Sequence, residues 1–142
     1  EDGQKMNKLI EQLKIHEGMK LKPYLCTSKK LTIGIGRNLD DVGISKEEAE
    51  MLLKNDIYEA TNQLLNAFPF MATFSDVRIS AMINFTFNVG IGTVRKFSNT
   101  IEYLKNEDWE AAADEMMDSK WAEQVGDRAI QITEQIRTGK WL

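Results

Sequence analysis

Residues 14–37 change their local character three times, and this stretch constrains the fold more than any other part of the chain. Up to residue 17 the apolar residues recur at helical spacing, and Gly18 then favours a helix end. Pro23 opposes any continuation of that helix, and residues 27–30 are turn-like. Residues 31–36 alternate, are rich in β-branched side chains and contain two glycines, which predicts an interrupted strand. The stretch therefore predicts a helix, a turn and a strand in close succession.

Three polar residues mark this stretch as a candidate site. Glu17 lies in the last helical turn, where the helix dipole disfavours a carboxylate by ~0.3–1 kcal/mol and so favours the protonated form that a general acid needs. Cys26 follows nine positions later and Thr32 six positions after that. We expect all three in one cleft. The alternatives are a solvated glutamate at a helix end and a cysteine that is only a small buried apolar side chain.

The order of these residues resembles a known enzyme family. Glu17 followed by glycine, then Tyr24, then Thr-Ile-Gly-Ile-Gly at 32–36, is similar to the bacteriophage lysozymes (endolysins) of the T-even type, glycoside hydrolase family twenty-four. Their catalytic pattern is a Glu, a second residue nine positions on, and a Thr six further. The second residue is usually Asp, and in a subset of phage endolysins it is Cys. This sequence resembles that subset.

The resemblance covers nearly the whole chain. Residues 81–90 are similar to the central helix of the family, and residues 127–129 and 137–141 are similar to its C-terminal end. It implies one lysozyme domain over residues 1–142, α+β and mostly helical. A small lobe with a β-hairpin (about 18–45) and a helical-bundle lobe (about 67–142 plus the N-terminal helix) would be joined by a long helix (about 46–66).

The expected helices also follow from local patterns. An amphipathic helix is expected over residues 4–16, and Ser45 with Glu48 predicts a capping box at the start of the connecting helix. Residues 76–88 are apolar nearly all round, which predicts a central helix. Asn84 within it must find partners or cost ~1–3 kcal/mol. Three further helices are expected at 98–105, 108–117 and 127–137.

The resemblance implies a muramidase that cleaves the β-1,4 bond between N-acetylmuramic acid and N-acetylglucosamine with inversion. Glu17 would be the general acid, and Cys26 and Thr32 would position or activate water. An ordinary thiol is mostly neutral at pH 7. Cys26 would therefore offer either a weak polar contact or, if Lys29 or Lys30 depresses its pKa, a thiolate base or nucleophile. Arg128 is the implied partner of Glu17, and the implied sugar contacts are Gly36, Asn38, Phe87, Asn88, Thr100 and Glu115.

The sequence departs from the family pattern at several points. The loop between Arg37 and Gly43 is much shorter than in the T-even members, and Arg37 stands where a His is common. Glu115 replaces a neutral amide. Many phage lysozymes are strongly basic, whereas the net charge here is −4, although the first 37 residues carry eight Lys and Arg against four acids. A basic rim beside the proposed cleft would attract an acidic wall polymer.

Composition limits the cofactors and partners. The single His16 and single Cys26 provide neither a zinc-binding cluster nor a disulfide, so no metal and no cofactor are expected. No apolar run approaches the ~20 residues that span a membrane, and we expect no export signal or anchor among these residues. The sequence shows no basic, aromatic-studded sheet or recognition helix, so we expect no nucleic-acid binding. We expect a monomer that acts on bacterial peptidoglycan at the cell wall.

Two other functions are compatible with the same residues. A wall-binding module that has lost catalysis would explain the missing Asp, and a lytic transglycosylase needs only one Glu and no attacking water. Thr32 favours hydrolysis over the second alternative, because a residue that orients water has no role where water does not attack.

Overall fold

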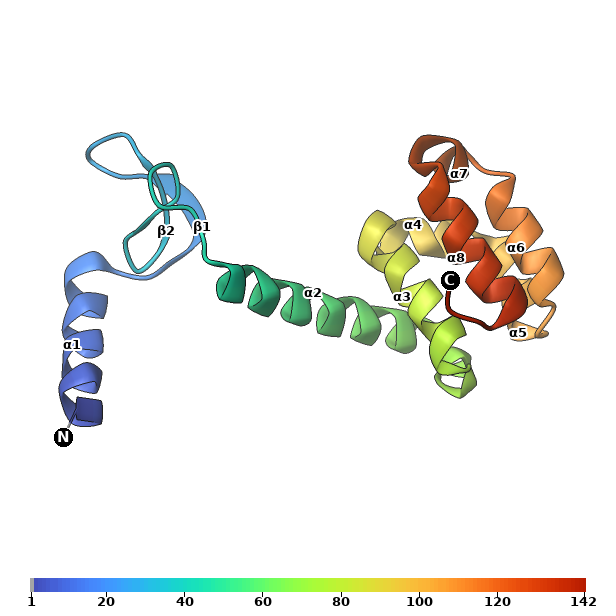
Figure 1. The fold of residues 1–142 in the computed structure, drawn as a ribbon, viewed down its shortest axis with the longest axis horizontal. Helices are drawn as coiled ribbons and strands as arrows, with labels where there is room; N and C mark the ends of the chain where they lie inside the picture. The colour runs from blue at the N-terminus through green and yellow to red at the C-terminus, as the bar shows by residue number, and fades with distance from the viewer. Residues whose placement is uncertain (1) are drawn as a thin grey trace. The chain divides into compact units, whose positions relative to one another are not determined.

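The structure is a computed structural model that describes residues 2–142. The chain divides into two compact units, Glu1–Met51 and Leu52–Leu142, which we call the first and second units and describe separately. The predicted class is confirmed: the protein is mostly helical, with one small antiparallel sheet (Figure 1).

The first unit contains one helix, a three-stranded sheet and the start of a second helix. The elements are α1 (Asp2–Glu17), β1 (Lys20–Leu25), β2 (Leu31–Gly34), β3 (Arg37–Asn38) and the first residues of α2 (Lys46–Ala67). The strands lie in the order β1-β2-β3, with β2 in the middle.

Glycines set the ends of these elements. Gly18 has a φ of +73° and its N–H donates to the Lys14 carbonyl at 2.9 Å, which confirms the predicted end of the first helix. The strand expected to reach residue 36 ends at Gly34 instead. Gly34 and Gly36 have φ values of +70° and +77°, which leads the chain into a tight turn before β3. Pro23 lies in β1, an edge strand, where a missing N–H is tolerated.

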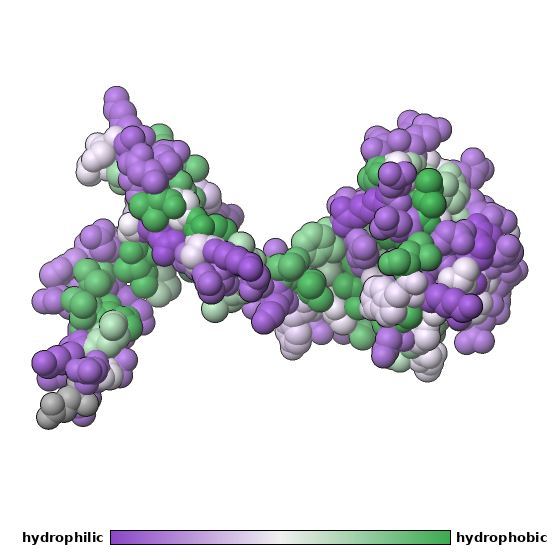
Figure 2. Space-filling view, viewed as in Figure 1, coloured by the Kyte–Doolittle hydropathy of each residue, from purple (hydrophilic) through white to green (hydrophobic). Residues whose placement is uncertain are grey.

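Helix α1 carries an exposed apolar stripe. Met6, Leu9, Ile10 and Leu13 are between 39% and 58% exposed, and the stripe is visible in green along the helix (Figure 2). The helix buries none of its own residues.

The second unit is helical. After the remainder of α2 it contains the 3-10 helix η1 (Pro69–Thr73), α3 (Asp76–Val89), α4 (Ile91–Lys96), α5 (Ser98–Lys105), α6 (Trp109–Met117), α7 (Lys120–Val125) and α8 (Asp127–Thr138). Helix α8 packs against α3, α6 and α7 (Figure 1). Helices α4 and α7 were not predicted, whereas the other helices lie within two residues of the predicted bounds.

The core of the second unit surrounds α3. Met82 and Phe85 are fully buried. The Phe85 ring makes edge contacts with Phe97 (centroids 4.9 Å apart) and Trp121 (4.7 Å). Such aromatic pairs add ~0.5–1.5 kcal/mol beyond the area that they bury. The apolar pattern of residues 76–88 therefore predicted the central helix correctly.

Polar caps fix the helix starts. The predicted capping box is confirmed: the Ser45 N–H donates to Glu48 Oε1 at 2.8 Å, and the Glu48 N–H donates to Ser45 Oγ at 3.1 Å. Asp108 caps α6 by accepting from the Ala111 N–H at 3.2 Å.

Candidate functional site

Glu17 ends α1, and its side chain lies directly against Gly36. A Cβ atom built on Gly36 would be 2.9 Å from Glu17 Oε2 and 3.1 Å from its carboxyl carbon. A side chain at residue 36 would force the carboxylate to move, so the glycine leaves room for it where it lies. Gly36 was predicted as a sugar contact. The structure also places it beside the predicted acid, Glu17.

Cys26 follows β1 and opens the turn that leads to β2. Its N–H donates to the Lys30 carbonyl at 3.0 Å, and its carbonyl accepts from the Lys29 N–H at 2.8 Å. Lys29 has a φ of +62°, which closes this turn in a conformation that non-glycine residues adopt infrequently. The thiol is half-buried.

The surroundings of Cys26 favour the thiolate. Hydrogen bonds from the backbone N–H groups of Lys30 and Ser28 lower the pKa of the Cys26 thiol, and the Thr32 hydroxyl adds to this effect. The sequence suggested the Lys29 and Lys30 charges as the cause. The lowering comes instead from the geometry of the turn, which directs backbone donors toward the sulfur.

Thr32 lies in the central strand of the sheet. It pairs with Tyr24 of β1 on one side and Asn38 of β3 on the other, and it is only 4% exposed. Its hydroxyl is 2.9 Å from the Lys30 carbonyl oxygen, to which it can donate. Because a hydroxyl carries one proton, it donates either to that carbonyl or to the Cys26 sulfur. Cys26 and Thr32 are therefore brought together by the β1–β2 pairing.

The shortened loop after β3 is held by side chains. Asn38 Nδ2 donates to Asp41 Oδ2 at 3.0 Å, and the Asp41 N–H donates to Asn38 Oδ1 at 2.9 Å. Asp40 Oδ2 accepts from the Leu31 N–H at 2.7 Å. The amide of Asn38 is thus engaged within its own loop, and its predicted contact with a sugar stays a prediction.

Arg37 connects this loop to α2. Its Nη1 donates to Glu48 Oε1 at 2.7 Å and to the Gly43 carbonyl at 3.1 Å. The hydrogen bond from Arg37 and the one from the Ser45 N–H lower the pKa of Glu48 to about 2. The sequence predicted Glu48 only as part of a helix cap, and its pairing with Arg37 was not predicted.

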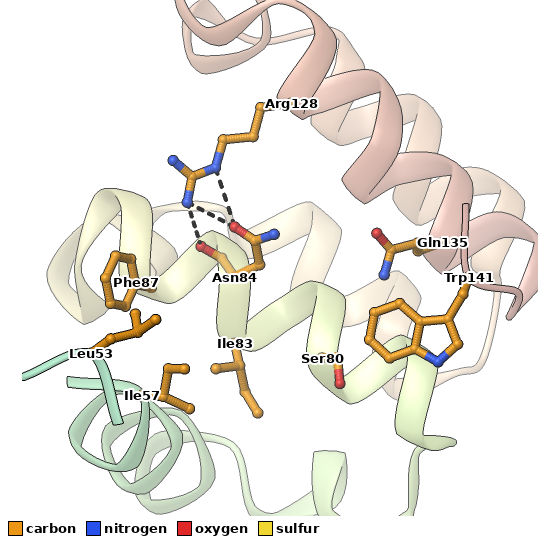
Figure 3. Close-up of a pocket in the computed structure, with 9 residues that line it drawn as sticks. All are labelled: Leu53, Ile57, Ser80, Ile83, Asn84, Phe87, Arg128, Gln135 and Trp141. Atoms are coloured by element: carbon orange, nitrogen blue, oxygen red, sulfur yellow. Dashed lines mark hydrogen bonds between the residues drawn. The ribbon is translucent and has the colours of Figure 1, made fainter. Parts of the chain in front are cut away.

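In the second unit, Arg128 lies beside a pocket of about 390 Å³ (Figure 3). Its Nη2 and Nε donate to Asn84 Oδ1 at 2.7 and 3.2 Å. The expectation that Asn84 finds a partner is therefore confirmed. The pairing of Arg128 with Glu17 stays a prediction. The pocket is lined by Leu53, Ile57, Ser80, Ile83, Asn84, Phe87, Arg128, Gln135 and Trp141.

The remaining predicted sugar contacts also lie in the second unit. Phe87 is 44% exposed and lines the same pocket. Asn88 Oδ1 accepts from Trp121 Nε1 at 2.7 Å, a partner that sequence reasoning missed because it lies far along the chain. Thr100 and Glu115 line a separate pocket of about 240 Å³, in which Thr100 Oγ1 is buried without a hydrogen-bond partner. The contact of these residues with substrate stays a prediction.

Two features are absent from residues 2–142. No group of three or more His, Cys, Asp or Glu side chains is arranged to hold a metal ion in this part of the chain. None of the described helices is both long and apolar enough to cross a membrane.

Known proteins share this sequence pattern. The family model described as phage lysozyme matches residues 14–137. "Probable T4-type lysozyme 1" of Dictyostelium discoideum is 27% identical over 94% of this chain and 96% of its own length. The "Endolysin" of Bacillus phage B103 is 33% identical over 82% of this chain and 45% of its own length. The "Endolysin" of Acyrthosiphon pisum secondary endosymbiont phage 1 is 32% identical over 78% and 74%.

Proposed function

Because this chain belongs to the phage lysozyme family and is a glycoside hydrolase of the lysozyme type, we propose that it is a muramidase that uses Glu17 as its general acid. Its substrate is bacterial peptidoglycan, and the bond cleaved is the β-1,4 link between N-acetylmuramic acid and N-acetylglucosamine. It acts at the cell wall and causes lysis, as the endolysin names of its relatives suggest.

The observation that carries this proposal is the position of the Glu17 carboxylate. It lies at the end of α1 beside Gly36, in space that a side chain at residue 36 would occupy. Among the described residues of the first unit Glu17 has no ion pair, and its pairing with Arg128 stays a prediction. General acid catalysis of glycoside hydrolysis needs a carboxylic acid that gives its proton to the glycosidic oxygen, and Glu17 is the proposed donor.

We further propose that Cys26 accepts the proton of the attacking water. The lowered pKa of its thiol raises the thiolate fraction at neutral pH. Water attacks the anomeric carbon and gives its proton to the sulfur, while the Glu17 proton goes to the leaving oxygen. Thr32 orients the water through its hydroxyl, which lies within reach of Cys26. Exchange with solvent then restores the thiolate and the carboxylic acid.

Sugar contacts complete the proposal. By resemblance, they are Gly36, Asn38, Phe87, Asn88, Thr100 and Glu115. Phe87 supports this assignment best, because an exposed aromatic ring beside a pocket offers an apolar face to a sugar ring.

The test compares the wild type with Glu17→Gln in clearing a suspension of purified peptidoglycan. We expect the rate to fall by roughly 10²–10⁴-fold, the usual contribution of general acid catalysis. Glu11→Gln is the matched control, because Glu11 lies on the same helix and is exposed. Equal rates for the wild type and Glu17→Gln would refute the assignment.

Two further measurements separate the alternatives. Mass spectrometry of the products distinguishes reducing ends, which hydrolysis leaves, from the anhydro-sugars of a lytic transglycosylase. A wild-type protein that sediments with the wall but never clears it would be a wall-binding module.

A further inference from the structure

Strand β3 is too short to hold itself in place. It consists of Arg37 and Asn38 at the edge of the sheet, and it pairs with Ile33 and Thr32 of β2. One more backbone bond follows it, from the Leu39 N–H to the Leu31 carbonyl at 2.7 Å. Two residues of ladder contribute few hydrogen bonds, and one side of an edge strand has none. Contacts made outside the sheet therefore add to the few hydrogen bonds that fix the turn at Gly34–Gly36.

The Arg37 side chain supplies such contacts. Its Nη1 reaches the Gly43 carbonyl at 3.1 Å, at the far end of the loop, and Glu48 Oε1 at 2.7 Å, on the first turn of α2. Glu48 is itself fixed, because the same Oε1 accepts from the Ser45 N–H at 2.8 Å. We call Arg37, Gly43, Ser45 and Glu48 the clasp. It joins β3 to a rigid helix end rather than to a freely moving side chain.

The residue directly before Arg37 is the one that touches the proposed acid. Gly36 has a φ of +77°, and a Cβ built on it would be 2.9 Å from Glu17 Oε2 and 3.3 Å from Glu17 Cγ. Because glycine lacks this Cβ, the Glu17 side chain occupies the space beside the Gly36 backbone, and a displacement of that backbone changes this space.

We propose that Arg37 and Glu48 are positioning residues for the reaction, which hold Gly36 against Glu17 through the clasp. The inference rests on the proposed role of Glu17. It also gives a reason for two departures of this chain from the family pattern: a much shorter loop, and an Arg where a His is common. Arg provides a charged group long enough to reach both the loop end and the helix.

The competing explanation is that the clasp only stabilises the fold. Both side chains are partly exposed, at 36% and 42%, and such pairs contribute little to stability. A purely structural clasp would change the melting temperature and leave the rate of each folded molecule unchanged. A positioning clasp would lower that rate even under conditions where the protein is fully folded.

The experiment uses the full chain with Arg37→Ala, Arg37→Lys and Glu48→Gln, and Glu47→Gln as the matched control. Glu47 lies on the same helical turn and has no ion pair among the described residues. At a temperature well below melting, we expect the peptidoglycan-clearing rate to fall about tenfold in Arg37→Ala, because small displacements of an acid are costly. Wall binding, measured by sedimentation, should not change. Arg37→Lys should recover part of the rate. The double variant Arg37→Ala/Glu48→Gln should clear the wall no more slowly than Arg37→Ala, because both substitutions break the same interaction.

A second readout does not depend on activity. The nuclear Overhauser effect between the Gly36 α-protons and the Glu17 γ-protons should be strong in the wild type and in Glu47→Gln, and weak in Arg37→Ala. An unchanged rate per folded molecule, or an unchanged Overhauser effect in Arg37→Ala, would overturn the proposal. If the wild type cleared no wall at all, the proposed function would fail, and the Overhauser measurement would still decide whether the clasp positions Gly36.

Discussion

The two units differ in what they bury. Among residues 2–51 only Thr32 is buried, and it is polar. Residues 52–142 enclose a continuous apolar core built around α3 and α8. The first unit is held by hydrogen bonds instead: the β1–β2–β3 ladder, the Asn38–Asp41 loop, the capping box and the Arg37 clasp. The second unit is held by packing, with polar contacts such as Arg128–Asn84 placed at its surface.

Because of this difference, we expect substitutions in the two units to affect the protein in different ways. Individual hydrogen bonds contribute about 0.5–1.5 kcal/mol each, and deletion of a large buried side chain costs several times more. Changes in the first unit should therefore alter the geometry of the proposed acid and thiol before they unfold the protein. Changes in the second unit should reduce stability first. The predictions below test that separation, from the largest expected effect to the smallest.

Replacement of Phe85 by Ala should destabilise the second unit by ~3–5 kcal/mol, because it removes a fully buried ring and leaves a cavity. Phe85 touches Trp121, so tryptophan fluorescence during urea unfolding reports the loss directly. All three tryptophans of the chain lie in this unit.

The exposed Phe87 on the same helix provides the control, since Phe87→Ala should cost far less stability. A similar loss of stability in the two variants would contradict the idea that the core, rather than the helix surface, holds this unit.

Cys26→Ser should lower the peptidoglycan-clearing rate at neutral pH about tenfold or more without a loss of stability. A serine hydroxyl is nearly the same size as a thiol but does not ionise in this range. In the wild type the rate should rise with pH through the lowered pKa of the Cys26 thiol, since the thiolate is the active form.

Cys26→Asp sharpens the test. An aspartate ionises at lower pH than a thiol, so the rise in rate should move to lower pH. A pH–rate profile that is the same for the wild type and Cys26→Asp would remove Cys26 from the proton transfer.

Features that depend on local sequence patterns could be predicted from the sequence. The helices with strong caps or long apolar patterns, such as residues 76–88, were predicted by local rules. Glu17, Cys26 and Thr32 also lie within one short stretch, and their shared cleft stays a prediction. Helices α4 and α7 have six residues each, fewer than two turns, and α4 starts at a glycine without a side-chain cap. A six-residue segment is too short for a helical period to be recognised.

The missed contacts were long-range. Trp121 reaches Asn88 from 33 positions away, and Arg128 reaches Asn84 from 44 positions away. The Arg37–Glu48 pair depends on a strand of two residues whose existence no pattern indicated. Such partners follow from how elements pack, which residue spacing alone does not specify.

Acid should weaken the clasp, and this is the smallest effect that we expect. Pairing with Arg37 holds the pKa of Glu48 at about 2, below its ordinary value of 4.5. A carboxyl whose pKa is depressed by folding contributes stability above its unfolded pKa and loses that stability as the pH falls through the folded pKa. The contribution of Glu48 should therefore be complete above pH 4.5 and disappear between about pH 4.5 and 2. Both side chains are partly exposed, so solvent screening should keep this contribution small.

Hydrogen exchange of the β2 amides reports this loss, because the first unit contains no tryptophan. The difference in protection between the wild type and Glu48→Gln should be present at pH 6 and should narrow as the pH falls from 4.5 towards 2. The tryptophan signal of the second unit should be the same in the two proteins at every pH. A difference in protection that stayed constant down to pH 2 would mean that the Glu48 charge does not hold β3, and that the first unit relies on packing after all.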